Sequence, residues 1–359
     1  MTRARGFSLV ELMIAMTLAL IVTTGVVSVF LGSRAAFQST SGTAELTDGG
    51  RFALNFISNS VRAAGYMACT TAAHVVGILN AGATPLALSF NEALGGFEAV
   101  NTGVGQAYGV ATPPVAADGN SSHWAGGLDG ALAGLPVMNS DVLVVRSTPA
   151  NTQTSYVSAI LDGATTFTVN TQGSLLGGQI AVLSDCAKGV AFQITSVGTG
   201  ANPVITHNAG GVPGNSTASF APLSFAPGSQ VTPVDTLVYF IGAGADGDGA
   251  LFVDDLNAVA PATVGPVELV PDIEAMQILY GLDTNSTQTV AEYVTADQVA
   301  DFNTVMSVKV ALLAASAPGA AKTAADATYT LLGTTVTAPF DTRSRHVFEE
   351  TVAVRNALP

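Results

Sequence analysis

The most pronounced pattern in the sequence is an apolar run from Phe7 to Leu31, in which Glu11 is the only charged residue. As an α-helix these 25 residues would rise about 37 Å, enough to cross a hydrocarbon core of about 30 Å with some tilt. The run is longer than the apolar core of a secretory signal peptide, and no small-residue cleavage pattern follows it. We therefore expect residues 7–31 to form a retained transmembrane helix. Gly25 interrupts it, either as a point of bending or as a close contact with a neighbouring helix.

A helical pattern continues beyond the apolar run. Apolar residues recur at spacings of three and four between Phe52 and Val61, which is typical of an amphipathic helix, and Gly65 marks its end. We expect residues 32–64 to continue the N-terminal helix out of the membrane. Its apolar side would then rest on a globular domain.

After residue 65 the pattern changes to short apolar runs bounded by turn residues. Met306, Val308, Val310 and Leu312 alternate with small or polar residues, as expected of a strand with one buried face. Similar runs are DVLVVRS, SYVSAIL, TFTVNT, QIAVLSDC, VAFQITSV, DTLVYFIGA, ALFVDD, YTLLGTTV and HVFEETVAVRN.

Residues 75–140 differ from this pattern because they are rich in Gly, Ala, Pro and Asn, and they predict a loop-rich insertion. The whole pattern predicts an α+β fold. One long N-terminal helix would pack on a mostly antiparallel β-sheet domain that spans residues 65–359.

Composition and charge narrow the function. Charged residues make up 11% of the chain, against about 25% in a typical soluble protein, and the net charge is −14 without a basic stripe. A nucleic-acid partner is therefore not expected. A surface of Ser, Thr, Asn, Gly and Ala suits an exported or assembled domain, although an Ala- and Gly-rich genome would give the same composition.

The charges that flank the apolar run predict its orientation. Arg3 and Arg5 precede it, so the positive-inside tendency puts the short N-terminus in the cytoplasm and the rest of the chain outside. Glu11 needs a partner, because a carboxylate inside a membrane span is costly. The arginines could reach it, it could be protonated, or another chain could supply a cation. Cleavage between Gly6 and Phe7 would create such a cation, the α-amine of Phe7.

The residues around this site carry a family resemblance. A short basic leader, Gly6, Phe7, an acid at Glu11 and a long apolar run together resemble the processing site of type IV pilins and of the related type II secretion pseudopilins. The resemblance implies that residues 1–6 are a prepilin leader peptide. It also implies that a prepilin peptidase cuts after Gly6 and methylates the amine of Phe7, and that Glu11 pairs with a neighbouring subunit during assembly.

Further stretches resemble one branch of this family, the PilW-like minor pilins. They are GRFALNFISNSVRAAGYMAC, VLSDCAKGVAFQITSV, ALFVDDL, VPDIEAMQILYGLDTN, FNTVMSVKVALLAAS and RHVFEETVAVRN. The resemblance implies a structural subunit of a tip or priming complex that initiates pilus assembly, for twitching motility and adhesion. Its implied partners are other minor pilins, the major pilin and the inner-membrane assembly platform. Its implied location is the inner membrane, with the globular domain in the periplasm, and then the cell surface.

Three other functions remain open. A J-type pseudopilin of a type II secretion system would have the same chemistry at Glu11. An exported adhesin or binding module would use residues 75–140. A secreted hydrolase with an uncleaved anchor is the third alternative.

The chain has two cysteines, Cys69 and Cys186, whose spacing fits no zinc or thioredoxin motif. They would pair if the domain is exported and remain free, buried thiols if it is not. Both cysteines lie in stretches that resemble the PilW-like pilins, and this resemblance favours a disulfide.

The sequence contains little that indicates a metal site or an active site. Asp246 and Asp248 form a D-x-D-G pattern that could wrap calcium, but Asn257 stands where an EF-hand loop needs a bidentate glutamate. A turn between strands explains the pattern better, so no cofactor is expected. The four histidines are scattered, and no nucleophile elbow, phosphate loop or zinc-protease motif is present. We therefore expect a protein that is not an enzyme.

Overall fold

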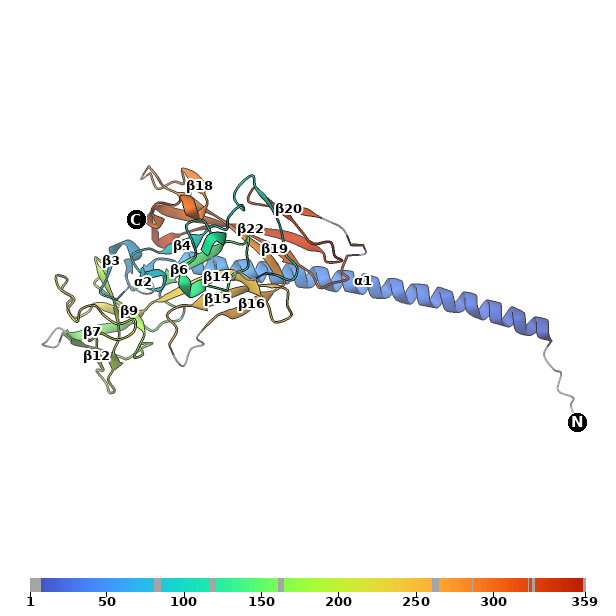
Figure 1. The fold of residues 1–359 in the computed structure, drawn as a ribbon. Helices are drawn as coiled ribbons and strands as arrows, with labels where there is room; N and C mark the ends of the chain where they lie inside the picture. Colours follow the sequence, from blue (N-terminus) through green and yellow to red (C-terminus); the bar gives the residue numbers. More distant parts are fainter. Residues whose placement is uncertain are drawn as a thin grey trace, which may run out of the picture.

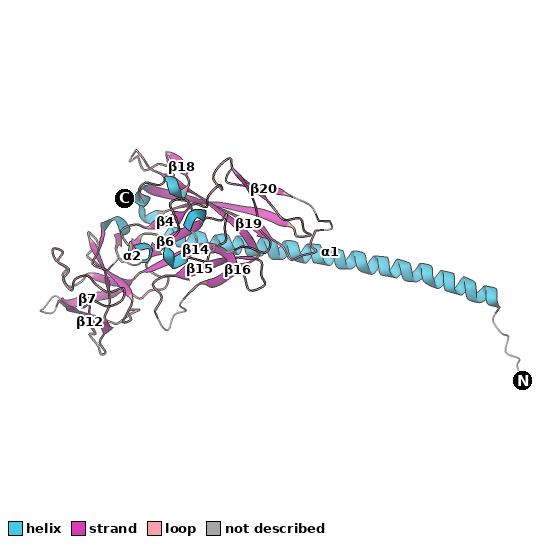
Figure 2. Ribbon diagram, viewed as in Figure 1, coloured by secondary structure: helices cyan, strands magenta, loops and turns pink. Residues whose placement is uncertain are grey.

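A single long helix forms the axis of the molecule in this computed structural model, which describes residues 8–80, 85–115, 121–160, 165–259, 265–285, 287–321, 323–324 and 327–357. The helix, α1 (Leu9–Ala63), has 55 residues. Its N-terminal part projects away from the rest of the chain, and its C-terminal part runs into a head made mainly of strands (Figure 1 and Figure 2). The two helical segments expected from the sequence are therefore one continuous element.

The local sequence explains where α1 begins and ends. Ser8 is the N-cap, and its hydroxyl accepts a hydrogen bond from the backbone N–H of Glu11 while the Glu11 side chain accepts one from the N–H of Ser8. This reciprocal capping box satisfies two amides that would otherwise be unpaired. At the other end Gly65 has a φ of +77°, a conformation that favours glycine and turns the chain out of the helix.

The C-terminal half of α1 packs on a four-stranded antiparallel sheet. The buried positions Leu46, Ala53, Ile57 and Val61 fall on one side of the helix. Their neighbours are mainly the last two strands of that sheet. In order, its strands are β18 (Glu292–Val294), β17 (Ile273–Leu282), β19 (Val305–Ala315) and β22 (Arg345–Ala353).

A second, five-stranded sheet shares the main hydrophobic core with α1 and the first sheet. Its order is β16 (Val267–Pro271), β15 (Gly249–Asp255), β14 (Asp235–Ala243), β6 (Val142–Ser147) and β4 (Leu94–Phe97). All of its strand pairs are antiparallel.

A third, eight-stranded sheet lies at the end of the head farthest from the N-terminus, where β7 and β12 are labelled in Figure 1. It has a separate core that includes Phe167, Leu183 and Phe192. Its order is β11 (Ser196–Val197), β12 (Val204–Thr206), β8 (Thr166–Val169), β7 (Ser155–Ile160), β13 (Gln230–Pro233), β9 (Ile180–Ser184), β10 (Gly189–Gln193) and β3 (Val75–Gly77).

Two small sheets and short helical turns complete the head. One sheet joins β20 (Thr328–Leu331), β21 (Thr334–Thr337) and β5 (Ala107–Gly109), and the other joins β1 (Tyr66–Met67) to β2 (Thr70–Thr71). The short helices are α2 (Pro85–Leu88), η1 (Ala72–His74), η2 (Ser121–His123), η3 (Gly130–Leu132), η4 (Ala296–Gln298), η5 (Phe302–Thr304) and η6 (Arg355–Ala357). In the described chain, β3 pairs with β10 and β5 with β21 in parallel, and the other strand pairs are antiparallel. The predicted fold class is confirmed.

Residues 75–140 are more integrated than a loop-rich insertion would be. In the described part of this segment, strands β3, β4 and β5 join three different sheets, and Trp124 is buried in a core with strands β6 and β14. Most of the described residues of this segment are still turns and loops, as expected, but Gly95 and Gly96 lie inside strand β4. A side chain at Gly96 would collide with Tyr280, so glycine here permits close packing between sheets.

Candidate assembly site

The N-terminal part of α1 presents an exposed apolar surface. Its large apolar side chains between Leu9 and Leu31 are between 49% and 76% exposed. The helix is long and apolar enough to cross a membrane, and none of its most apolar window is buried against the head. This surface anchors the chain in a membrane or packs against other apolar helices.

The hydroxyl groups in this segment are satisfied within the helix. Thr17, Thr23, Thr24 and Ser28 each donate a hydrogen bond to a backbone carbonyl three or four residues earlier, at 2.7–2.9 Å. Such bonds let hydroxyl groups lie in an apolar environment without a partner from outside. Glu11 is the one charged residue among residues 8–31, so it is the group in this segment whose charge still needs a partner.

Glu11 lies in the first turn of α1, where the helix dipole favours an anion. Its Oε2 accepts the backbone N–H of Ser8 at 3.0 Å. A carboxylate has two oxygens, so Oε1 remains for a donor from outside the capping box. Gly6 and Phe7, the predicted cleavage site, lie outside the described residues, and their cleavage and methylation stay predictions.

The outer side of α1, opposite the head, remains exposed beyond the apolar segment. Phe37 is 74% exposed and Phe52 is 54% exposed, and the Phe52 ring lies 4.6 Å from that of Phe56. Phe37 and Phe52 are thus single exposed aromatic rings on this helix rather than one continuous apolar patch.

The head holds the inner side of α1 by close backbone approach and by polar contacts. Gly42 and Gly50 are buried, and a side chain at Gly50 would collide with the ring of Phe348 on β22. Farther along, Arg62 donates to Glu350 at 2.6 Å, in a pair that is about one-third exposed. These contacts fix the C-terminal half of α1 against the sheet, so the exposed N-terminal half extends directly from the head.

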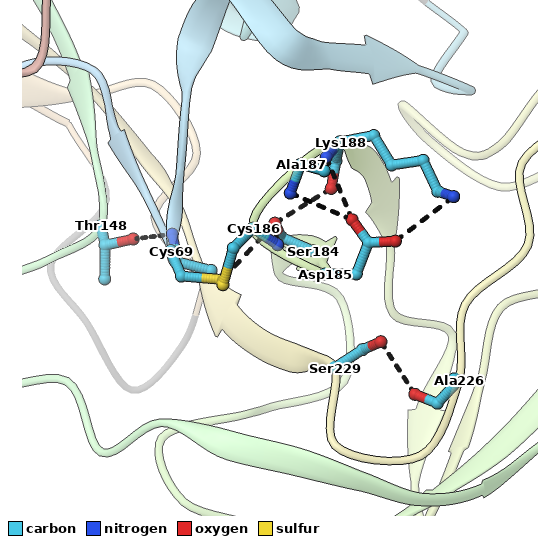
Figure 3. Close-up of a disulfide and its surroundings, with 10 residues drawn as sticks. Cys69, Thr148, Ser184, Asp185, Cys186, Ala187, Lys188, Ala226 and Ser229 are labelled. Atoms are coloured by element: carbon cyan, nitrogen blue, oxygen red, sulfur yellow. Dashed lines mark hydrogen bonds and ion pairs between the residues drawn. A yellow bond between two sulfur atoms is a disulfide. The ribbon is translucent and has the colours of Figure 1, made fainter. Parts of the chain in front are cut away.

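The structure contains the predicted disulfide between Cys69 and Cys186 (Figure 3). Cys69 follows the end of α1 by six residues, and Cys186 lies in the turn between β9 and β10. The Ser184 hydroxyl accepts the backbone N–H of Cys186 at 3.0 Å and orders that turn. The disulfide thus connects the helix end to the eight-stranded sheet.

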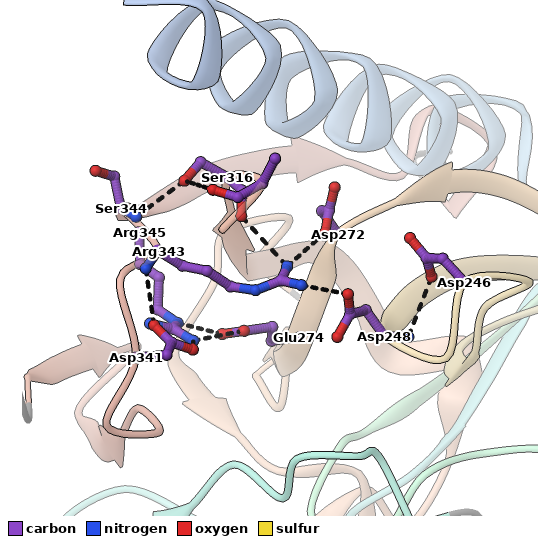
Figure 4. A network of polar contacts seen from close by, with 10 residues as sticks. Asp246, Asp248, Asp272, Glu274, Ser316, Asp341, Arg343, Ser344 and Arg345 are labelled. Atoms are coloured by element: carbon purple, nitrogen blue, oxygen red, sulfur yellow. Dashed lines mark hydrogen bonds and ion pairs between the residues drawn. The ribbon is translucent and has the colours of Figure 1, made fainter. Parts of the chain in front are cut away.

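The calcium candidates Asp246 and Asp248 lie beside an arginine (Figure 4). The Asp246 carboxylate accepts the backbone N–H of Asp248 at 3.1 Å, which is a turn contact within the β14–β15 hairpin. Arg343 pairs with Asp248 and, at 2.8 Å, with Asp272. The guanidinium group carries one positive charge against the three carboxylates of Asp246, Asp248 and Asp272, whose oxygen atoms lie within 4.8 Å of one another. That no cofactor binds here stays a prediction.

A second arginine extends this network. Arg345, whose side chain is 2% exposed, donates to Glu274 at 2.6 Å and to Asp341 at 2.6 Å. Its hydrogen bonds lower the pKa of the Asp341 carboxyl below its usual value. The two arginines tie the chain before β22 to the β17 side of the head.

Sequence reasoning missed two buried carboxyl groups, Glu98 and Asp141, which are 5% and 2% exposed. They are 43 positions apart in the sequence and meet only through the pairing of β4 with β6. An acid next to an apolar run is the only sequence signal, and it does not identify a partner.

Two family models match this chain, one near its C-terminus and one at its N-terminus. A family model described as type IV pilus-assembly protein W matches residues 238–356, and one described as the prokaryotic N-terminal methylation motif matches residues 1–27. The first match contains the four-stranded sheet that holds α1. Among curated proteins, none is significantly similar to the chain.

Among solved structures, a type IV-like pilin from Thermus thermophilus is similar, with 20% identity over 51% of this chain and 86% of its own. The TM-score is 0.22, too low for an argument about the head.

Proposed function

Because these matches identify the chain as a PilW-like type IV minor pilin, we propose that it belongs to a tip or priming complex that initiates pilus assembly. The observation that carries this proposal is α1 itself. Its apolar half is exposed, its capped end carries one carboxylate, and its other half is fixed rigidly to a large head.

The proposed assembly step occurs at Glu11. After cleavage behind Gly6, the amine of Phe7 of one subunit would approach Glu11 Oε1 of its neighbour while Oε2 stays in the capping box. In an apolar surrounding, an ion pair of this kind removes much of the cost of burying each charge. The pair would align neighbouring helices axially as they leave the membrane.

The position at the tip is supported by the shape of the head. The eight-stranded sheet lies outside residues 238–356, which match the family model. It is at the end of the head farthest from the apolar part of α1. A head of this size packs more easily at the end of a filament than within its shaft. The partners would be other minor pilins, the major pilin, a prepilin peptidase and an inner-membrane assembly platform.

The proposed orientation follows from Arg3 and Arg5, which would keep the N-terminus in the cytoplasm. The head would then lie in the periplasm and reach the cell surface with the filament. Two features are compatible with this location: a disulfide, which forms in oxidising compartments, and a surface with few charges.

The test is a deletion strain complemented with the wild-type chain. We expect the deletion to reduce the number of surface pili, and immunogold labelling of the complemented strain to mark fibre ends. Labelling along the whole shaft would contradict the tip position. Normal piliation together with lost exoprotein secretion would instead assign the chain to a type II secretion filament.

The adhesin alternative should be tested by surface substitutions rather than by deletion of residues 75–140. Removing residues 75–140 would also remove β3, β4 and β5 from three sheets, so the head would not fold normally. Substitutions at exposed positions such as Val104 and Val115 leave the core intact and are the better probe of surface attachment.

A further inference from the structure

The head contains a pair of buried carboxyl groups that neither the filament function nor the fold explains. Glu98 directly follows β4, and Asp141 directly precedes β6. The pairing of Phe97 with Val142, together with the hydrogen bond from the Ala99 N–H to the Asp141 carboxylate, places the two side chains next to each other and within hydrogen-bonding reach. Two ionised carboxylates cannot hold such a contact, because like charges repel strongly in a buried site.

Asp141 is the more strongly hydrogen-bonded member of the pair: burial raises its pKa to about 7, and the backbone amides of Ala99 and Ile278 oppose that rise. Its Oδ1 accepts the backbone N–H of Ala99 at 3.1 Å, and its Oδ2 accepts the backbone N–H of Ile278 at 2.8 Å. Its own N–H donates to the carbonyl of Met276 at 3.0 Å. A carboxylate that accepts two amide hydrogen bonds is stabilised in its charged form. Asp141 thereby connects the segment after β4 to β17 in the neighbouring sheet.

Glu98 lacks the donors that an ionised carboxylate requires. Its Oε2 is buried and, within the described chain, accepts no hydrogen bond. Its Oε1 lies 3.4 Å from the Thr102 hydroxyl, but that hydroxyl makes a shorter bond of 2.8 Å to the carbonyl of Ala99. A protonated Glu98 resolves this, because its O–H would donate to Asp141.

The charged surroundings favour the same state. Burial raises the pKa of the Glu98 carboxyl most strongly, and the negative charges of Asp141 and Asp297 raise it further. Burial raises the pKa of the Tyr108 phenol on β5 and of the Tyr280 phenol on β17, and the negative charges of Asp141 and Glu98 raise both further. On the same side of the head, Lys309 lies 3.8 Å from the ring centre of Tyr293 and takes part in a cation–π contact.

We propose that Glu98 and Asp141 share one proton and act as a pH-sensitive latch that holds the segment after β4 against β17. With the proton in place, Glu98 donates to Asp141, and Asp141 binds the amides of Ala99 and Ile278. When the proton leaves, two negative charges face each other in a buried site. Separation of the two segments then relieves the repulsion.

Glu98, one member of the latch, lines a cavity with both polar and apolar walls. The cavity has a volume of about 480 Å³, and its lining includes Glu98, Gln106, Tyr293 and Asp297. Release of the latch would widen this cavity at the edge of the four-stranded sheet, where β18 lies (Figure 1). The inference concerns the head alone and holds whichever filament the chain joins.

Hydrogen–deuterium exchange of the full-length chain in detergent tests the latch. Peptides that contain the Ala99 and Ile278 amides are followed from about pH 6 to about pH 10, and each rate is divided by its intrinsic rate. We expect protection in the wild type to fall by up to about tenfold per pH unit as the pH rises toward the pKa at which the shared proton is lost, and to level off above it. Glu98→Gln supplies a permanent N–H donor to Asp141, so its protection should stay constant with pH.

Glu45→Gln, on the exposed side of α1, is the matched control and should behave like the wild type. An equal pH dependence in wild type and Glu98→Gln would overturn the latch. A second measurement covers the case in which Glu98→Gln does not fold. Infrared spectra of the wild type with isotope-labelled glutamate should show a protonated glutamate carboxyl at neutral pH, and its absence there would also overturn the proposal.

Discussion

At the scale of single residues, Glu11 has two separable roles. Its carboxylate completes the capping box with Ser8, and its charge is the group proposed to meet a neighbouring subunit. Glutamine can also complete a capping box, but it carries no charge. The two roles therefore respond differently to two substitutions.

Glu11→Gln and Glu11→Ala separate these roles. We expect both variants to insert in the membrane and both to be depleted from sheared filaments at least tenfold, since each lacks the charge. Quantitative immunoblots of membrane and filament fractions measure this. If Glu11→Gln incorporates normally while Glu11→Ala does not, the carboxylate acts through helix capping rather than through pairing between subunits.

Arg345 is the residue whose loss should cost the head most among its charged contacts. Its side chain is 2% exposed and pairs with Glu274 and Asp341. Arg345→Met leaves two carboxylates without their cation and should lower the free energy of unfolding by about 3 kcal/mol. Fluorescence of Trp124, the sole tryptophan, follows urea unfolding because its ring is buried.

The matched control for Arg345 is Arg51→Met, at an exposed position on α1. It should change the free energy of unfolding by about 0.5 kcal/mol or less. Equal effects of the two substitutions would mean that the network around Arg345 does not stabilise the head.

At the scale of elements, two glycines of α1 have different surroundings. Gly50 is buried against Phe348, whereas a Cβ at Gly25 would have no other side chain within 4 Å of it. Glycine is the less favourable residue in a helix by about 1 kcal/mol relative to alanine. Alanine should therefore help the helix at both positions and disturb packing only at Gly50.

Gly50→Ala should destabilise the head by about 1–3 kcal/mol, because the new methyl group forces Phe348 and β22 away from the helix. Gly25→Ala is the control and should leave the unfolding of the head unchanged. Thermal unfolding of both variants in detergent measures the difference. A stabilised Gly50→Ala variant would show that the helix and sheet adjust to the methyl group without loss.

The elements also show what the sequence could predict. The apolar run, the spacing from Phe52 to Val61 and the alternation around Val308 predict α1 and β19 because each depends on local periodicity. The same holds for Glu11, which is recognised by its local motif. These features need no knowledge of distant contacts.

The remaining features depend on long-range pairing. Strand β3 pairs with β10, more than a hundred residues later, and no local pattern contains that choice. Glu98 and Asp141 meet for the same kind of reason, since β4 and β6 pair across residues that read as a loop. A glycine in a strand and a glycine in a turn look alike in sequence, and only the collision with Tyr280 explains Gly96.

At the scale of the whole molecule, the disulfide joins the parts of the head. It closes 117 positions of sequence between Cys69 and Cys186 and links the end of α1 to the eight-stranded sheet. The chain-entropy account predicts a contribution of about 4–5 kcal/mol for a loop of this length. Changing both cysteines to serine should lower the midpoint of unfolding accordingly.

Reductant gives the internal control for the disulfide prediction. The wild type should become less stable in reductant and approach the double-serine variant, whereas the variant should not respond. Unfolding followed with and without reductant measures both. A wild type that unfolds identically in the two conditions would show that the disulfide contributes nothing to the stability of the head.

The whole molecule should also be more stable in mild acid than in mild alkali. Burial raises the pKa of several carboxyls, among them Glu92, Asp254 and Asp255. For Asp235, burial and the negative charge of Asp255 raise the pKa to about 7. Such groups bind more protons in the folded state than in the unfolded state. Their stabilising effect is complete below the unfolded pKa of about 4 and is lost as pH rises to the folded value.

Asp235→Asn isolates this effect at one position. At about pH 5 the wild-type carboxyl is protonated in the folded head, and the neutral amide should unfold at a similar temperature. At about pH 8 the wild type must bury a charge, so the variant should unfold at a higher temperature, by about 2 °C or more for each 1 kcal/mol of relief. Thermal scans at the two pH values measure the difference.

Because Asp235 lies on β14, in the sheet that shares its core with α1, the loss of stability at high pH would reach the helix junction as well. If the unfolding temperature of Asp235→Asn rises equally at both pH values, the charge of Asp235 is not what destabilises the wild type.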